Sequence, residues 1–290
     1  PVQRSERLWQ QALQVSEAAL ATGALVPLDT HLEQLQGLEP FVLRRLLSRS
    51  PRHLRPEGPR PNPFLPWDVP LEVERLGQHV ILLNKFPVQP AHLLVITAAW
   101  APQRGWLTPA DWQAVARVAA DTGGLWFFNS SAVAGASQPH RHLQLLPRRR
   151  EDISCPLAPL LEQQLQGAAP PWPWAYHLSR RRDPLGGNDL PELYREHCRA
   201  LGLGEVGRES QPQAAYNLLF DDHWFLSVRR RQEHCAGLSI NALGFAGYLL
   251  STSEAQEAWL MQHGPWRLLE AVADPRDACG LHGPAPSVTP

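Results

Sequence analysis

The sequence predicts an α+β fold in which antiparallel sheets are flanked by helices and the chain forms two related halves. The first half contains two short apolar segments, Gln78–Asn84 and His92–Thr97, which are typical of a β-hairpin. The second half repeats this pattern with Ala214–Phe220 and Trp224–Val228, and a helix is predicted downstream at 253–263. The two hairpins are too far apart for a solenoid repeat, so a duplicated α+β unit is the expected architecture.

Composition excludes several broad classes of protein. The 290 residues are 43% hydrophobic, enough for a substantial core, and the 27 basic residues nearly balance the 28 acidic ones. That balance gives no overall field to attract nucleic acid or a membrane surface, and neither is an expected partner. The four cysteines form no Cys-x-x-Cys pair and no secretory signal is visible, so a cytoplasmic location is expected.

The remaining elements of the first half follow from local patterns. Apolar spacing predicts a helix over Ser5–Leu20, and 41–47 is predicted to be helical and basic. A proline-rich connector follows over 51–70, and Lys85–Pro90 is a predicted turn. Thr108 and Pro109 suit the cap and first position of a helix that runs to about Ala120. Two further strands are predicted, Leu125–Phe128 and Arg141–Leu146.

Three parts are predicted along the chain. Residues 1–155 form an N-terminal half and 189–290 form a C-terminal half. Between them, 156–188 is a connector rich in proline and arginine, which its tryptophans indicate is ordered. Two uncharged stretches, 123–139 and 236–253, contain many small residues and are interpreted as buried turns around a cleft rather than membrane spans.

The most informative segment is 129–147. If a strand begins near Pro139, alternation places His140, His142 and Gln144 on one face. Leu143 and Leu145 then lie on the other face, which suits a core; a helix would separate the two histidines and end abruptly at Pro147. The strand is the more economical interpretation.

This row of side chains suits phosphoryl chemistry. A neutral imidazole is a good nucleophile toward phosphorus near neutral pH. The preceding loop, Gly135-Ala136-Ser137-Gln138, offers N–H groups, a hydroxyl and an amide, which are the parts of a phosphate-binding cradle. A pair of structural histidines beside an ordinary turn is the alternative interpretation, but so many suitable groups in sixteen residues favour a functional site.

The same residues carry a resemblance. The His140-x-His142-x-Gln144 row resembles the transferase branch of the histidine-triad superfamily, in which glutamine replaces the third histidine. The segment from Asn129 to Gln144 is similar to the signature of galactose-1-phosphate uridylyltransferase, and more similar to that of ATP adenylyltransferase, the diadenosine tetraphosphate phosphorylase family. Further matching pieces are 62–66, 83–86, 92–97 and 239–247.

The resemblance implies a nucleotidyltransferase that phosphorolyses diadenosine tetraphosphate to ATP and ADP, and runs in reverse. His142 would form an adenylyl-histidine, Gln144 would bind the phosphoryl oxygens, and His140 would orient the nucleophile or hold the loop. The residues that would bind substrate are Asn84, Lys85, Asn129, Gly135, Ala136, Ser137, Gln138, Asn241, Ala242 and Leu243. The resemblance also implies that 1–155 is the catalytic half and that 189–290 completes the nucleotide cleft. The implied partners are a dinucleoside polyphosphate, ATP or ADP, and inorganic phosphate.

Two details bear on charge at this site. Lys85 is the one lysine among the 27 basic residues, and lysine presents a compact charge that arginine does not reproduce. Residues 249–252 lack a lysine that the family's pattern would place there, which leaves the polyphosphate contacts of the second half in doubt. The arginine triplets at 148–150, 180–182 and 229–231 could supply charge, but each is interpreted as a solvated surface.

The sequence leaves two other functions open. A hexose-1-phosphate uridylyltransferase would share the histidine chemistry, although its pattern usually has proline where Arg141 stands. A non-catalytic nucleotide-binding module is the other alternative. No protein metal site is visible; a divalent cation such as Mg²⁺ would at most accompany the polyphosphate.

Overall fold

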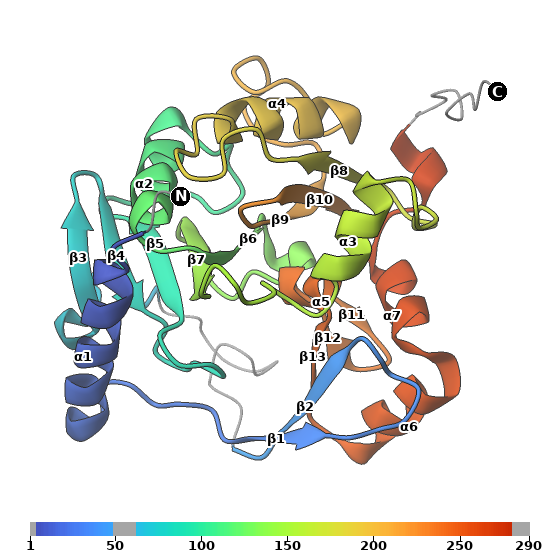
Figure 1. Cartoon of the computed structure of the whole chain (residues 1–290), viewed down its shortest axis with the longest axis horizontal. Helices are drawn as coiled ribbons and strands as arrows, with labels where there is room; N and C mark the ends of the chain where they lie inside the picture. The colour runs from blue at the N-terminus through green and yellow to red at the C-terminus, as the bar shows by residue number, and fades with distance from the viewer. Residues whose placement is uncertain (1–3, 49–61, 280–290) are drawn as a thin grey trace.

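The computed structural model describes residues 4–48 and 62–279, and its centre is one antiparallel sheet of eight strands (Figure 1). The strand order is β3-β4-β5-β7-β6-β9-β10-β8, so strands from both halves of the sequence share a single sheet. The strands are β3 (Glu72–Leu76), β4 (His79–Leu83), β5 (Leu93–Thr97), β6 (Gly124–Asn129), β7 (His142–Pro147), β8 (Tyr176–Arg180), β9 (Ala215–Phe220) and β10 (Trp224–Arg230). Both predicted hairpins are confirmed, as β4–β5 and β9–β10.

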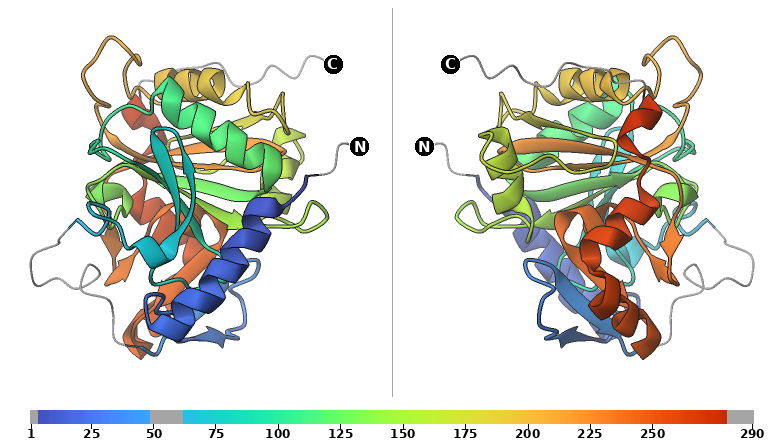
Figure 2. Two further views of the ribbon diagram at one scale, coloured as in Figure 1. Left: turned by 90° about the vertical axis from the view of Figure 1, so that its left-hand side faces the viewer. Right: turned by 90° about the vertical axis from the view of Figure 1, so that its right-hand side faces the viewer.

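Helices cover both faces of this sheet. One face packs against α1 (Arg7–Thr22), α2 (Pro109–Asp121) and α4 (Leu190–Ala200) around the larger hydrophobic core. The opposite face packs against α3 (Ala158–Leu165), α5 (Ala242–Ala246), α6 (Glu254–His263) and α7 (Pro265–Val272). Figure 2 shows α1 and α2 in front of the strands from one side, and α6 and α7 from the other. The α+β prediction is confirmed.

The helix boundaries follow from their capping residues. Thr108 caps α2, and its side chain accepts a hydrogen bond from the N–H of Asp111 while the Asp111 carboxylate accepts one from the Thr108 N–H. This reciprocal capping box, with Pro109 at the first helical position, fixes where the helix begins. The predicted helix at 253–263 is also confirmed, because Ser253 caps α6.

The prediction of a helix at 41–47 is wrong. Residues Val42–Leu46 form β2, which pairs antiparallel with β1 (Thr30–Glu33) and parallel with β13 (Tyr248–Ser251) in a separate three-stranded sheet. Leu43 and Leu46 are buried while the arginines between them are half-buried. Tertiary pairing with strands far away in the sequence therefore overrides a segment whose local composition suits a helix.

The two connectors also differ from the predictions. The connector at 156–188 is ordered as expected, but it contributes α3 and the edge strand β8, which pairs with β10. It is therefore part of the central sheet rather than a link between two halves. Of the proline-rich connector, 51–61 lies outside the described residues, and 62–71 contains a β-bridge between Phe64 and Trp67 and a short 3-10 helix, η2 (Val69–Leu71).

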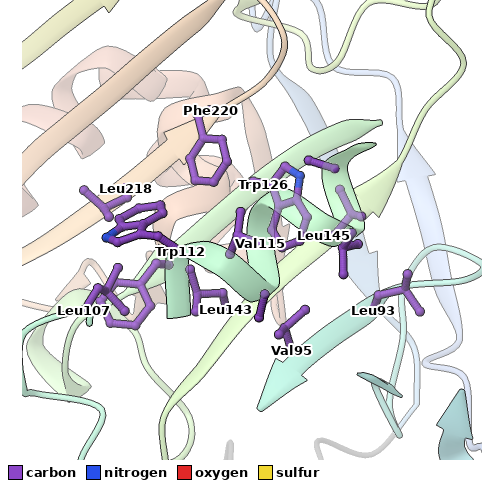
Figure 3. Close-up of a cluster of buried hydrophobic side chains, with 14 of the residues drawn as sticks. Leu93, Val95, Leu107, Trp112, Val115, Trp126, Leu143, Leu145, Leu218 and Phe220 are labelled. Atoms are coloured by element: carbon purple, nitrogen blue, oxygen red, sulfur yellow. The ribbon is translucent and has the colours of Figure 1, made fainter. Parts of the chain in front are cut away.

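The core fixes which way the side chains of β7 point. Leu143 and Leu145 are buried against α2 and the neighbouring strands, together with Val95 and Trp126 (Figure 3). Trp126 stacks on Phe220, with ring centroids 5.8 Å apart and planes 5° from parallel. Because strand side chains alternate, this packing directs His142 and Gln144 to the opposite face, as predicted.

Candidate active site

The candidate nucleophile, His142, occupies the first position of β7. Its ring is almost fully buried, with 2% of the residue exposed. Nδ1 lies 2.7 Å from the backbone oxygen of His140, which can only accept, so Nδ1 carries the proton and Nε2 keeps its lone pair. Burial lowers the pKa of His142 to about 4, which keeps the ring neutral at physiological pH.

The backbone around His142 is held by Gln103. The N–H of His142 donates to Gln103 Oε1 at 2.8 Å, and Gln103 Nε2 donates to the carbonyl of Asn129 at 2.7 Å. Gln103 is buried and belongs to the loop that follows β5. It ties the start of β7 to the end of β6, and no local sequence pattern singles it out.

His140 precedes β7 and forms an isolated bridge with Pro102. Its Nε2 lies 2.7 Å from the carbonyl oxygen of Thr97, so this nitrogen donates, and Nδ1 accepts from Asn62 Nδ2 at 3.2 Å. Burial lowers the pKa of His140. With both ring nitrogens engaged, His140 serves to hold its own carbonyl, the acceptor for His142, in place.

Gln144 belongs to a chain of three hydrogen-bonded side chains. His92 Nε2 lies 2.8 Å from Gln144 Oε1, and Asn84 Nδ2 lies 3.1 Å from His92 Nδ1. In the consistent arrangement Asn84 donates to His92 and His92 donates to Gln144, which directs the Gln144 amide nitrogen away from His92. Burial lowers the pKa of His92 to about 4, so its ring remains a neutral donor and acceptor.

Asn84 and Lys85 are adjacent in the sequence, but their side chains have different surroundings. Asn84 acts through His92, whereas the Lys85 ammonium is at the surface, with 41% of its side chain exposed. Lys85 Nζ forms an ion pair of 2.8 Å with Asp68, which is itself 47% exposed. An exposed pair of this kind is weak, so a phosphate could replace Asp68 as the partner of Lys85.

The predicted phosphate cradle forms a tight turn around the short 3-10 helix η3 (Ala132–Ala134). The N–H of Gly135 donates to the Ala132 carbonyl and the N–H of Ala136 donates to the Ser131 carbonyl. In this structure the turn uses these two N–H groups, and their binding to phosphate stays a prediction. Ser137 and Gln138 remain available in the described structure, and the buried Oε1 of Gln138 has no hydrogen-bond partner there.

Asn129, for which the resemblance implies a contact with phosphate or ribose, makes its hydrogen bonds within the protein in this structure. Its buried Oδ1 accepts from the N–H of Ala242 at 2.8 Å and from Asn217 Nδ2 at 2.8 Å. The side chain thus anchors the start of α5 from the end of β6. Asn241 caps the same helix by accepting from the N–H of Leu243 at 2.9 Å.

The turn at Gly135 and the start of α5 are in direct contact. Gly135 has φ of 87°, and a Cβ added there would lie 2.6 Å from the Cβ of Asn241. Ala242 is fully buried and Leu243 half-buried. The structure therefore brings the predicted residues of the second half against the cradle of the first, although they are more than 100 positions apart in the sequence.

The interpretation of the arginine triplets as solvated surface is wrong at two places. Arg181 and Arg230, the middle residues of the second and third triplets, are buried. Arg181 forms an ion pair of 2.9 Å with Asp189. In these two triplets the middle arginine enters the core while its neighbours remain nearer the surface, whereas Arg149 of the first triplet is exposed as predicted.

Residues 4–48 and 62–279 contain no group of three or more His, Cys, Asp or Glu side chains arranged to hold a metal ion. None of the helices there combines the length and apolar character that crossing a bilayer requires.

Comparison with known proteins identifies the family. Residues 1–163 match the model for the Ap4A phosphorylase N-terminal domain, and 170–275 match the ATP adenylyltransferase C-terminal domain. The chain is 27% identical over 226 residues to diadenosine 5',5'''-P1,P4-tetraphosphate phosphorylase 2 of Saccharomyces cerevisiae, covering 67% of this chain and 68% of the relative. It is 37% identical over 73 residues to Protein APA1 of the same yeast, covering 23% of each.

The fold agrees with this result. The crystal structure of yeast Ap4A phosphorylase Apa2 in complex with Ap4A has a TM-score of 0.72 and 21% identity, covering 94% of this chain and 99% of that one. The family models favour the first of the three functions that the sequence leaves open. The chain belongs to the Ap4A phosphorylase family of nucleotidyltransferases.

Proposed function

We propose that this chain phosphorolyses diadenosine tetraphosphate to ATP and ADP through an adenylyl-histidine on His142. The observation that carries this proposal is the hydrogen bond from His142 Nδ1 to the His140 carbonyl. It fixes the tautomer in which Nε2 is the nucleophile, in a buried position where the ring is neutral. Membership of the Ap4A phosphorylase family supports the choice of substrate.

In the first half-reaction the lone pair of His142 Nε2 attacks the α-phosphorus of diadenosine tetraphosphate. The bond from that phosphorus to the bridging oxygen breaks, and ATP leaves with the electron pair. The ring becomes an adenylyl-imidazolium, whose positive charge is stabilised because Nδ1–H points at the His140 carbonyl.

In the second half-reaction an oxygen of inorganic phosphate attacks the same phosphorus. The N–P bond breaks, its electrons return to Nε2, and ADP leaves with the enzyme regenerated. The reverse sequence makes diadenosine tetraphosphate from ATP and ADP. In both directions the Gln144 amide nitrogen, positioned by His92, would donate to the phosphoryl oxygens as charge develops on them.

The remaining contacts follow from the groups that are available. Ser137 and Gln138 would bind the phosphoryl group under attack, and Lys85 would exchange Asp68 for a phosphate of the substrate. Mg²⁺ would enter with the polyphosphate as part of the substrate, since hard divalent cations prefer phosphate oxygens.

Product analysis tests the reaction. The purified chain is incubated with diadenosine tetraphosphate, with and without inorganic phosphate, and the nucleotides are separated by ion-exchange chromatography. ATP and ADP in equal amounts, sustained only when phosphate is present, are expected. Two molecules of ADP, or ATP plus AMP without phosphate, would instead identify a hydrolase and refute the proposal.

Arginine is not expected to replace Lys85. The Lys85→Arg variant keeps the charge but substitutes a broad planar group for a compact ammonium, so kcat/KM for diadenosine tetraphosphate should fall on the order of tenfold or more. Asp68→Asn is the matched control, because it removes the partner of Lys85 and leaves the ammonium in place. Initial rates decide the question: an arginine variant as active as the parent would remove Lys85 from the site.

The rate of adenylylation is expected to be insensitive to pH across the range in which free histidine titrates. Since burial lowers the pKa of His142 to about 4, Nε2 stays unprotonated well below pH 6.5. Internal phosphates of the substrate do not titrate there. Single-turnover release of ATP without phosphate should hold its rate from pH 7.5 to about 5 and decline only toward pH 4; a midpoint near 6.5 would contradict the buried, neutral nucleophile.

That measurement needs short exposure to acid. His92 and His142 are neutral in the folded protein down to about pH 4 but protonate near 6.5 when the chain is unfolded. The free energy of unfolding therefore decreases as pH falls from 6.5 to 4, by about 3 kcal/mol for each ring. A pH-jump mixing experiment measures adenylylation before the protein unfolds.

A further inference from the structure

Arg230 is the last residue of β10, and its side chain is enclosed by the site's two loops. The residue is 2% exposed. Its guanidinium donates to Asn217 Oδ1 at 2.6 Å and to the carbonyl of Ile240 at 2.7 Å. Further carbonyl acceptors are those of Gln232 at 2.9 Å, Val272 at 3.1 Å and Ala134 at 3.4 Å.

This buried cation has no carboxylate partner in the described residues. Arg181 pairs with Asp189, and Arg229, adjacent on the same strand, pairs with Asp274 at 2.8 Å, but no carboxylate lies within 4 Å of the Arg230 guanidinium. Glu233 attracts it only from farther away, and burial lowers the pKa of Arg230 to about 9, so the group is still charged at neutral pH. A buried, unpaired charge is unfavourable unless something else balances it.

The bonds of Arg230 converge on the two loops of the candidate site. Asn217, which accepts from Arg230, donates in turn to Asn129 Oδ1 at 2.8 Å and to the Ala134 carbonyl at 2.9 Å. Asn129 accepts from the N–H of Ala242, at the start of α5. The Ala134 and Ile240 carbonyls immediately precede Gly135 and Asn241, the residues at which the two loops touch.

We propose that Arg230 is a positioning residue that holds loop 131–138 against loop 240–243, and that the bound polyphosphate balances its unpaired charge. Arg230 then determines the preference of the site for highly charged nucleotides over uncharged nucleosides. It supplies positive charge to a second half that lacks lysine at 249–252. The inference rests on the proposed function for the identity of the ligand.

Equilibrium binding tests this proposal without turnover. Adenosine and ATP are titrated into the His142→Ala protein by calorimetry, with and without Arg230→Gln or Arg230→Lys. We expect Arg230→Gln to weaken ATP binding at least tenfold and adenosine binding less than threefold. Arg230→Lys should keep the ratio of the two affinities within threefold of the parent at pH 6.5, because it keeps the charge.

Arg229→Gln is the matched control. It removes the same charge from the adjacent residue of β10, whose guanidinium lies near the surface beside Asp274. The ratio of ATP to adenosine affinity should not change in this variant. An equal change in Arg229→Gln and Arg230→Gln would mean that overall charge, not the position of Arg230, governs binding, and would overturn the proposal.

The two roles of Arg230 are separable. If it only supports the fold, Arg230→Gln weakens adenosine and ATP by the same factor, and the electrostatic role is refuted. If Arg230→Gln does not fold, Arg230→Lys can test the electrostatic role in its place. Burial lowers the pKa of a lysine, so this variant loses its charge at a lower pH than the parent. Its preference for ATP should then decline between pH 6.5 and 8, a range in which the parent keeps its charge and its preference remains constant; parallel profiles would overturn the proposal.

Failure of this inference is distinguishable from failure of the proposed reaction. The binding titrations use a protein that lacks the candidate nucleophile. If the unmodified chain does not phosphorolyse diadenosine tetraphosphate but Arg230 still governs the preference for ATP, the reaction is wrong and the role of Arg230 stands. If phosphorolysis occurs and the preference does not depend on Arg230, only this inference is lost.

Discussion

Replacing His142 by alanine is expected to lower the rate of phosphorolysis on the order of 10⁴-fold or more. Removal of a covalent nucleophile eliminates the pathway rather than weakening it, and comparable knockouts in other enzymes have effects of this size. The side chain is also buried, so the melting temperature should fall, but binding of ATP should persist. Initial rates of ATP formation from diadenosine tetraphosphate measure the effect.

A second histidine provides the control for this variant. His177, on the edge strand β8, packs against the ring of His197 at 4.5 Å between centroids and takes no part in the site. His177→Ala should therefore retain most of the rate. A His142→Ala protein that keeps more than about 1% of the parent rate would rule out His142 as the nucleophile.

Replacing Gly135 by alanine is expected to have the next largest effect. The new Cβ would lie 2.6 Å and 2.7 Å from the Cβ and Cα of Asn241 and 2.9 Å from the Ile240 carbonyl, and φ of 87° is strained for alanine. Since the obstructing atoms are largely backbone, the cradle must separate from the start of α5. We expect kcat/KM to fall about 100-fold and the free energy of unfolding to decrease by about 2 kcal/mol.

Gly207 provides a control that separates backbone strain from steric obstruction by the new Cβ. Its φ is 92°, close to that of Gly135, but no atom lies within 4 Å of the position that a Cβ would occupy. Gly207→Ala should therefore lose about 1 kcal/mol of stability and none of its activity. Urea denaturation and initial rates of both variants make the comparison. If Gly135→Ala behaved like Gly207→Ala, contact between the two loops would not matter for catalysis.

The parts of the fold that sequence could predict depend on short-range patterns. Consecutive residues are enough to recognise the strand alternation in β4, β5, β9 and β10 and the capping box at Thr108. Residues 41–47 could not be assigned in this way, because β2 is stabilised by β1 and by β13, some 200 positions away. The edge strand β8 could not be predicted for the same reason, because it is defined by its pairing with β10.

The candidate site also contains some residues that a local pattern predicts and others that depend on contacts between distant segments. His140, His142 and Gln144 stand within five positions, and the period of a strand is enough to align them. His92 could not be found that way, because it reaches Gln144 only through the register that pairs Leu94 of β5 with Gln144 of β7. Asn62 and Gln103 come from irregular segments with no period at all.

Arg230 was predictable in principle. Trp224, Leu226 and Val228 alternate as the buried face of β10, and continuing that alternation by one step places Arg230 among them. The charge of the side chain concealed the pattern, since arginine is rarely buried. A charged residue that falls on the apolar period of a strand is therefore worth considering as a buried functional group.

The adenylyl-histidine on His142 can be detected directly by isotopic labelling. Diadenosine tetraphosphate labelled with ³²P at its outer phosphates is mixed with the protein without inorganic phosphate, and the protein is then isolated and digested. We expect up to one label per chain on the peptide containing His142, stable to base and labile to acid, and recovered as ADP when phosphate is added to the undigested protein. Absence of protein-bound label, or label on a residue other than His142, would contradict it.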